Sequence, residues 1–523
     1  MKTEFILRRR IAFFNILKWF LASVFIGAVV GVFNAMFLKL LSAAVDYTTS
    51  FKYYFFALPL GLLLVNHLAK KVYPKDKGYS TNDAIAAIND KRPISLISAA
   101  KAFFLPIITI SAGGSAGKES PCADVGAGVA SFCSDLFSFN KQERRKLMIC
   151  GVSAGFAGVF GVPISGALFG LEVLSVGTVF YEVMFPAFIS GITAFQVTHL
   201  FGVEYIYHPM NLQTLNIDSS LLQVFFAGLF FGVVGLIFIE ALKVTQIIFR
   251  FIAVKFSNFW RCFIAAALII LIALLTSPAY LGLSMERVEA ILAGDQALTF
   301  GFMYKIITTS LTFAGGGVGG LITPVLFIGA NAGYFFAHIL GIDTVTFASL
   351  GMVSVLAGVA NTPLAASVMA IELFGATVAP YAAVSCIVSF LITGRRSIFS
   401  KQHFTFDKNM AEDEEEPAPR QSVKQLEKTL KKKNFILASV RHLIPDMKNF
   451  DVLKQNEKKP RKKKKTAEIS QSDTPAKSTA EEKPQEQKTE FKKKFSLLNH
   501  LMLFPEEELA GKDGNKSEND NNK

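Results

Sequence analysis

Long apolar runs separated by short polar stretches fill the chain as far as about residue 400. These runs carry few charges and lie at residues 11–45, 53–65, 221–239, 262–275 and 347–392. The first and last of them exceed the about 20 residues that a helix needs to cross a bilayer. The pattern predicts an all-α integral membrane protein with several membrane passes.

Two further apolar stretches, residues 105–128 and 315–333, are interrupted by glycine and proline. This composition does not favour a simple spanning helix, and exposed backbone is tolerated in a membrane only where it lines a protected cavity. Both stretches therefore predict broken or re-entrant helices inside the protein.

Composition and charge agree with the membrane class. Hydrophobic residues make up 51% of the chain, and its mean hydropathy is +0.39. The net charge is +13, but lysine and arginine concentrate at residues 8–10 and beyond Arg395. The positive-inside rule then predicts that both termini are cytoplasmic, in the plasma membrane, which is the inner membrane in bacteria. We expect no binding of nucleic acid.

The composition changes sharply after Phe399. Residues 1–400 are predicted to form the transmembrane domain, and residues 401–523 a largely disordered cytoplasmic tail, rich in Lys and Glu, without a recognised domain. Within this tail, residues 423–443 form a predicted basic helix, and residues 491–504 mix basic with apolar side chains. We expect the latter to contact anionic lipid or a cytoplasmic partner.

Two motifs occur twice in the same order along the membrane part. The frame Gly-x-x-x-Pro-x-x-x-x-Gly spans residues 117–126 and recurs 203 residues later at 320–329. The frame Ala-Gly-Val-x-x-x-Pro begins at Ala157 and again at Ala357, and each copy is followed by a glutamate, Glu172 or Glu372. The repeats predict two related halves, at about residues 15–205 and 215–400. Duplicated, interrupted segments indicate the central site of a transporter.

The segments 113–121 and 315–324 each consist of a Gly-rich run that ends in a proline suited to the first turn of a helix. Helix N-termini present unpaired N–H groups and a positive dipole end, so two converging N-termini would form an anion site. Glu119 places a carboxylate where an anion would bind. We interpret it as a gate that blocks the site when ionised and withdraws when protonated. The alternative is an ordinary first-turn glutamate that stabilises the helix dipole at a wet surface.

Over residues 78–400 the chain resembles the CLC family of chloride channels and transporters. The family motif G-(K/R)-E-G-P appears as Gly117-Lys-Glu-Ser-Pro121, and G-x-F-x-P as Gly320-Leu-Ile-Thr-Pro324. Residues 160–173 are similar to the family's following helix. The resemblance implies a CLC-type inverted-repeat bundle of tilted and broken helices. It also implies a homodimer with one pathway per subunit that conducts chloride or a similar small anion.

The resemblance makes Glu119 the gating glutamate and implies a set of anion-binding positions. These are Tyr79, Ser80, Gly117, Lys118, Ser120, Pro121, Gly320, Leu321, Ile322, Thr323 and Phe399. The chain departs from the family at both central hydroxyl groups. The motif G-S-G-I-P appears only as Gly78-Tyr-Ser-Thr-Asn82, so either Tyr79 or Ser80 is the donor, and Phe399 stands where the family has tyrosine. Fluoride and nitrate therefore stay open as alternatives to chloride.

Val173 occupies the position at which proton-coupled members of the family carry a second glutamate. This substitution favours a channel, with a proton-coupled antiporter of chloride or fluoride as the alternative. Glu172 and Glu372 are interpreted as structural residues at helix ends or an interface, rather than as proton ligands.

A rival class is suggested by Gly113-Gly-Ser-Ala-Gly117, which satisfies the G-x-S-x-G pattern of serine hydrolases. An intramembrane hydrolase would use Ser115, but a nucleophile elbow follows a strand, and an apolar membrane-type segment precedes this one. The five cysteines lack pair spacing. We expect neither an enzyme nor a bound metal or cofactor.

Overall fold

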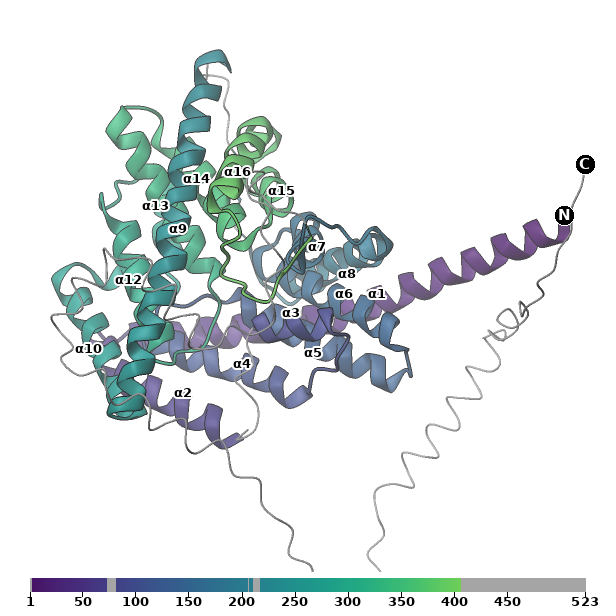
Figure 1. Ribbon diagram of the computed structural model, residues 1–523, viewed down its shortest axis with the longest axis horizontal. Helices are drawn as coiled ribbons and strands as arrows, with labels where there is room; N and C mark the ends of the chain where they lie inside the picture. The colour runs from purple at the N-terminus through teal and green to yellow at the C-terminus, as the bar shows by residue number, and fades with distance from the viewer. Residues whose placement is uncertain (1, 73–80, 206, 210–216, 406–523) are drawn as a thin grey trace, which may run out of the picture. The chain divides into compact units, whose positions relative to one another are not determined.

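The computed structural model describes residues 2–72, 81–205, 207–209 and 217–405, which fold mainly into α-helices (Figure 1). The first half holds α1 (Lys2–Thr49), α2 (Leu58–Val72), α3 (Thr81–Asn89), α4 (Leu96–Ser111), α5 (Glu119–Leu136), α6 (Lys141–Phe160), α7 (Pro163–Glu172) and α8 (Tyr181–Leu200). The second half holds α9 (Ile217–Lys255), α10 (Asn258–Leu275), α11 (Met285–Leu292), α12 (Gly301–Ala314), α13 (Ile322–Leu340), α14 (Thr344–Ala360), α15 (Pro363–Phe374) and α16 (Ala379–Thr393). Two-residue strands β1 (Ser175–Val176) and β2 (His403–Phe404) pair in parallel. The residues predicted to form a basic helix in the tail lie outside the described residues.

Within the described residues, six helices are long and apolar enough to cross a membrane. The interruptions predicted at residues 105–128 and 315–333 are confirmed, because α4 and α5 are separate helices, as are α12 and α13. The long run at residues 347–392 is divided among α14, α15 and α16. Its breaks fall at Asn361, in the left-handed conformation with a φ of 58°, and at Gly375, with a φ of 93°.

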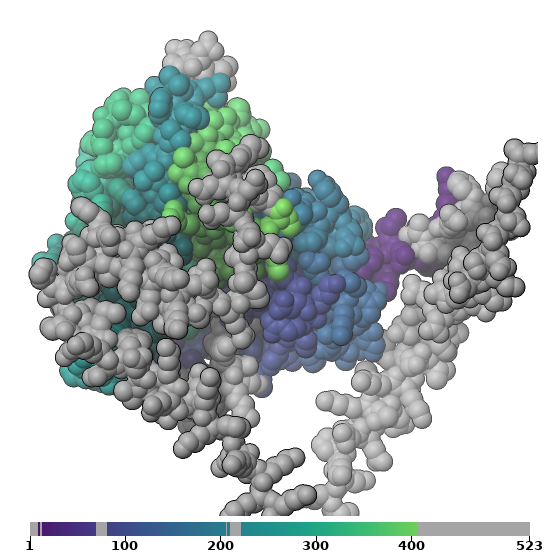
Figure 2. Space-filling view, in the orientation of Figure 1, coloured from purple at the N-terminus to yellow at the C-terminus, as the bar shows by residue number. Residues whose placement is uncertain are grey.

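The two halves repeat the same packing. Helix α5 packs on α6 as α13 packs on α14, and α1 packs on α8 as α9 packs on α16. In Figure 2 the first half, in purple and blue, lies beside the second, in teal and green. The internal duplication predicted from the motifs is therefore a structural repeat.

Paired glycines let the repeated helices approach closely. A Cβ on Gly126 of α5 would meet the carbonyl oxygen of Gly151 on α6, and a Cβ on Gly329 of α13 would meet that of Gly351 on α14. Small residues at such crossings are typical of membrane helices, whose association depends on close van der Waals packing. These contacts fix α5 and α13 within the bundle.

Helices α7 and α15 are joined by a reciprocal exchange of carboxylates. Glu372, at the end of α15, accepts hydrogen bonds from the N–H groups of Ile164 (2.9 Å) and Ser165 (2.8 Å) at the start of α7. Glu172, at the end of α7, accepts them from Leu364 (3.1 Å) and Ala365 (2.9 Å) at the start of α15. Each carboxylate satisfies N–H groups that a helix start leaves unpaired. This agrees with the interpretation of both glutamates as structural residues, and reciprocal contacts of this kind indicate a two-fold relation between the halves.

Candidate anion site

The Gly-rich loops before α5 and α13 are tied directly to each other. The N–H of Gly117 donates to the carbonyl of Gly320 at 2.7 Å, and the N–H of Gly320 donates to the carbonyl of Gly117 at 2.8 Å. The two helix starts that the sequence predicted to converge therefore lie side by side.

Two buried threonines support these loops from the preceding helices. Thr109 of α4 accepts a hydrogen bond from the N–H of Val318 in the second loop, at 3.1 Å. Thr312 of α12 accepts one from the N–H of Ser115 in the first loop, at 3.0 Å. Sequence reasoning missed both threonines, although they are 203 residues apart, which is the spacing of the first repeated frame.

The Glu119 carboxylate occupies the N-terminus of α13. Its Oε1 accepts a hydrogen bond from the N–H of Ile322 at 2.5 Å, and its Oε2 accepts one from the Thr323 hydroxyl, also at 2.5 Å. The residue is fully buried, with 0% exposure. A carboxylate here meets the free N–H groups and the positive dipole end of the helix, which are the features that bind a free anion.

Gly117 and Gly320 provide the space for this carboxylate. A Cβ built on either glycine would run into the carboxyl oxygens of Glu119. The two glycines of the repeated frame thus serve a common purpose, which is to let an anionic group lie against backbone from both halves.

Four further positions implied by the resemblance lie at these two helix starts. Lys118 directly precedes α5, and the buried Ser120 and Pro121 lie in its first turn. Leu321 directly precedes α13. Tyr79 and Ser80 lie outside the described residues.

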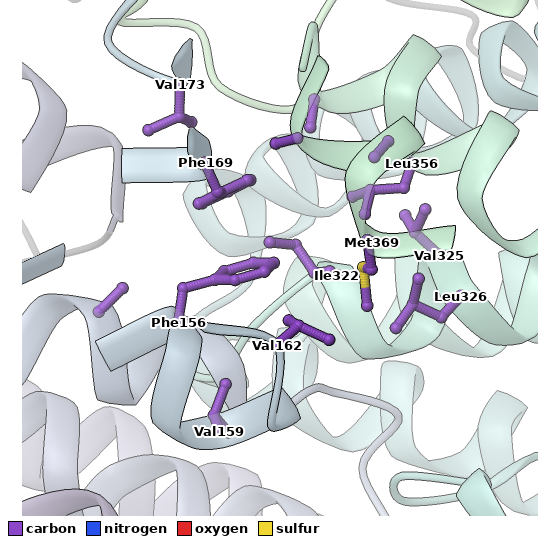
Figure 3. Close-up of a cluster of buried hydrophobic side chains, with 14 of the residues drawn as sticks. Phe156, Val159, Val162, Phe169, Val173, Ile322, Val325, Leu326, Leu356 and Met369 are labelled. Atoms are coloured by element: carbon purple, nitrogen blue, oxygen red, sulfur yellow. The ribbon is translucent and has the colours of Figure 1, made fainter. Parts of the chain in front are cut away.

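The surroundings of Phe399, another position implied by the resemblance, are apolar. Phe399 is 3% exposed, and its ring meets that of Phe169 edge to face, with the ring centroids 6.4 Å apart. Phe169 in turn stacks on Phe156 at 4.0 Å. Figure 3 shows Phe156 and Phe169 in the same buried cluster as Val173 and Ile322. No hydroxyl or carboxyl group is contributed by these side chains.

Gln402, which the sequence reasoning did not single out, links the ends of α7 and α14 by hydrogen bonds. Its amide nitrogen donates to the carbonyls of Val173 (3.0 Å) and Ala360 (2.8 Å). Its amide oxygen accepts a hydrogen bond from Asn361 at 3.1 Å. The segment that carries Phe399 is therefore fastened to the ends of α7 and α14.

Ser115, the nucleophile of the rival hydrolase hypothesis, is fully buried, and its hydroxyl hydrogen bonds to that of Thr309 at 2.8 Å. Threonine cannot act as the general base that a serine nucleophile requires. Within the part of the chain that the structure describes, no cluster of three or more His, Cys, Asp or Glu side chains could hold a metal ion.

A duplicated bundle of membrane helices, with two helix N-termini converging on a buried carboxylate, defines the class of anion channels and transporters. The family model described as voltage gated chloride channel matches residues 61–394. The chain belongs to this family, the CLC anion channels and transporters, and is a multi-pass membrane protein.

Known relatives include channels and antiporters. The chain is 32% identical over 407 residues to a chloride/fluoride channel protein of Pseudomonas syringae pv. tomato, an alignment that covers 75% of this chain and 88% of the relative. It is similar to the crystal structure of a CLC-type fluoride/proton antiporter, with 26% identity, a TM-score of 0.71, and coverage of 75% of this chain and 99% of the other. It also shares the fold of a slow cyanobacterial Cl-/H+ antiporter, with a TM-score of 0.64 and 17% identity, over 72% of this chain and 94% of the other. These similarities confirm the CLC-type fold.

Proposed function

We propose that this chain carries a small halide, chloride or fluoride, across the membrane through the site between α5 and α13, with Glu119 as its gate. The observation that carries the proposal is the position of the Glu119 carboxylate on the N–H of Ile322 and the hydroxyl of Thr323. An anion that binds the start of α13 competes with this carboxylate for the same donors. Membership in a family of channels and transporters supports ion movement rather than catalysis.

The choice between chloride and fluoride rests on the surroundings of the site and on the relatives. Phe399 removes one of the two hydroxyl groups that the family resemblance implies for a central chloride ion. The names of two relatives mention fluoride as well as chloride or protons. Fluoride is the smaller ion, and it is hydrogen-bonded well by backbone N–H groups, which Ile322 supplies.

The direct test is halide efflux from liposomes that contain the purified protein, with a potassium ionophore to set the voltage. We expect efflux of chloride, fluoride or both, well above that from protein-free liposomes. Absence of both fluxes from protein that is monodisperse and correctly inserted would contradict the proposal.

A second candidate is proton-coupled exchange of the same halides. It is favoured by the direct competition between Glu119 and the anion, because protonating the carboxylate removes its charge and releases the start of α13. Val173 favours passive conduction instead, since it has no group to carry a proton. Recording external pH during the efflux measurement distinguishes the two candidates, because only exchange drives protons against their gradient.

We also propose, on family resemblance, that two copies associate as a homodimer with one pathway each, that both termini are cytoplasmic, and that the plasma membrane is the location. Cross-linking of the protein in native membranes tests the association. Protease protection of tags at each end tests the orientation.

A further inference from the structure

A second buried carboxylate, Asp124, lies five residues beyond Glu119 on α5. Asp124 is only 4% exposed, and its Oδ2 accepts a hydrogen bond from the Thr81 hydroxyl at 3.3 Å. Its Oδ1 is buried and accepts no hydrogen bond from the described residues. Buried polar groups are nearly always satisfied, and an ionised carboxylate with one bare oxygen is especially unfavourable.

We infer that Asp124 is a proton-binding residue that exchanges protons with Glu119, so that halide movement is coupled to protons without a glutamate at Val173. The inference rests on the proposed function of the Glu119 site and selects its proton-coupled form. A proton on Asp124 removes the buried charge that the structure leaves unsatisfied.

Among the described residues, the carboxylates of Asp83 and Glu119 lie close enough to Asp124 for their charge to disfavour its ionised form. Asp83 lies in the first turn of α3, and Glu119 begins α5. Helix α5 also packs on α1, α4, α6 and α13. On α1, Lys18 pairs with Glu143 of α6. Lys101 lies on α4. On α6, Arg144 pairs with Asp135 of α5. Since both acting charges are negative, loss of charge from Glu119 favours loss of the proton from Asp124, and the two sites are linked.

The surroundings of Asp124 fit a proton better than a metal ion. One carboxylate and one threonine hydroxyl are too few oxygen ligands for Ca²⁺ or Mg²⁺, which take six or more. A proton needs only one oxygen and a water molecule to deliver it.

The position of Asp124 connects the halide site to one face of the protein. Five helical residues correspond to about 7.5 Å along the axis, so Asp124 and Glu119 lie on different turns of α5. The start of α3 beside Asp124 touches the segment that carries Phe399, through hydrogen bonds of Asn82 with Ile398 (3.5 Å) and Lys401 (3.4 Å). Residues Thr81 to Asp83 are partly exposed there, which allows solvent to approach.

The transfer conserves protons and charge. A water molecule from the pathway takes the Asp124 proton and delivers one to Glu119, so Asp124 becomes an anion as Glu119 becomes neutral. Glu119 then leaves the start of α13, and a halide takes its place. Asp124 regains a proton from the solvent beside α3. The buried side chains of the region that holds Val173, among them Phe156, Phe169 and Ile322, are apolar and offer no group that binds a proton (Figure 3).

The test measures halide efflux and proton movement together in liposomes, for the wild type, Asp124→Asn and a control, Asp135→Asn. Asp135 is an exposed acid at the far end of α5, paired with Arg144. We expect the wild type and the control to move protons with halide. We expect Asp124→Asn to keep halide flux within about threefold while proton movement per halide falls at least tenfold.

Unchanged coupling in Asp124→Asn overturns the inference, and so does wild-type halide flux without protons; both leave the proposed function standing. No wild-type flux of either halide contradicts the proposed function itself. If Asp124→Asn does not fold, Glu119→Gln protein in weakly buffered detergent provides the second test. Addition of fluoride or chloride should still cause proton uptake, because a bound anion favours a neutral Asp124; absence of uptake overturns the inference.

Discussion

At the scale of single residues, the site depends on two glycines without side chains as much as on the charged carboxylate of Glu119. Glu119 can lie on the start of α13 only because Gly117 and Gly320 have no side chain there. Its carboxylate then receives one backbone and one hydroxyl hydrogen bond. Hydrogen bonds to charged groups contribute about 1.5–3 kcal/mol each, so the closed position is held by a modest free energy that an anion can match.

Thr323→Val should therefore open the gate. The substitution keeps the size of the side chain but removes the hydroxyl that binds the Glu119 carboxylate. We expect halide efflux at neutral pH to rise several-fold and to need less acid for activation. Thr308→Val is the matched control, because the Thr308 hydroxyl bonds to carbonyls of its own helix. Equal flux from Thr323→Val and the wild type would show that this hydrogen bond does not hold the gate.

The sequence predicted the residues that lie on repeated frames and missed those defined by tertiary contacts. Glu119, Gly117 and Gly320 stand out because their motifs recur with Gly and Pro at fixed spacing. Thr109 and Thr312 carry no local signal, since threonine is common in membrane helices. Asp124 was recognised only because it is buried and its Oδ1 accepts no hydrogen bond from the described residues. A sequence shows neither property.

At the scale of helices, the duplication explains why broken segments are stable inside a membrane. Helix ends expose N–H groups that lipid cannot satisfy. Here the other half supplies partners, in the loops just before α5 and α13, where Gly117 pairs with Gly320, and at the starts of α7 and α15, which the two glutamates cap. The glycine and proline pattern predicted where helices break, but it could not identify which groups satisfy the exposed ends.

Glu172→Ala and Glu372→Ala should each destabilise the protein without changing its response to pH. Each removes a carboxylate that accepts two backbone N–H groups at a helix start. Loss of a helix cap costs about 0.5–2 kcal/mol, and the burial of Glu172 places its variant toward the upper end. Thermal unfolding in detergent measures the loss, and liposome efflux measures the pH profile.

Glu182→Ala is the control for these variants, because Glu182 forms an exposed ion pair with Lys146, which contributes at most about 1 kcal/mol. A Glu172→Ala protein of wild-type stability with an altered pH profile would instead make Glu172 part of the proton pathway.

At the scale of the whole molecule, transport is expected to reside in residues 1–405. Thr405 donates hydrogen bonds to the carbonyl of Val176 through both its N–H (3.1 Å) and its hydroxyl (2.8 Å), which completes the pairing of β1 with β2. We predict that a chain ending at Thr405 inserts and carries halide within about twofold of the full chain.

A chain that ends at Ser400 provides the contrast, because it also loses β2 and Gln402, which fastens the ends of α7 and α14. We expect this shorter chain to be less stable to heat. Loss of flux in a well-inserted chain ending at Thr405 would place part of the transport function in the tail.

The central claim is that Glu119 closes the halide pathway when ionised and opens it when protonated. The most direct measurement is halide efflux from liposomes between pH 4.5 and 7.5, for the wild type and for Glu119→Gln, whose amide cannot change charge in this range. The account predicts that wild-type efflux rises as the pH falls, because protonation removes the charge that holds Glu119 at the start of α13, while Glu119→Gln loses most of this dependence on pH. A Glu119→Gln protein that keeps the wild-type dependence on pH would contradict the account.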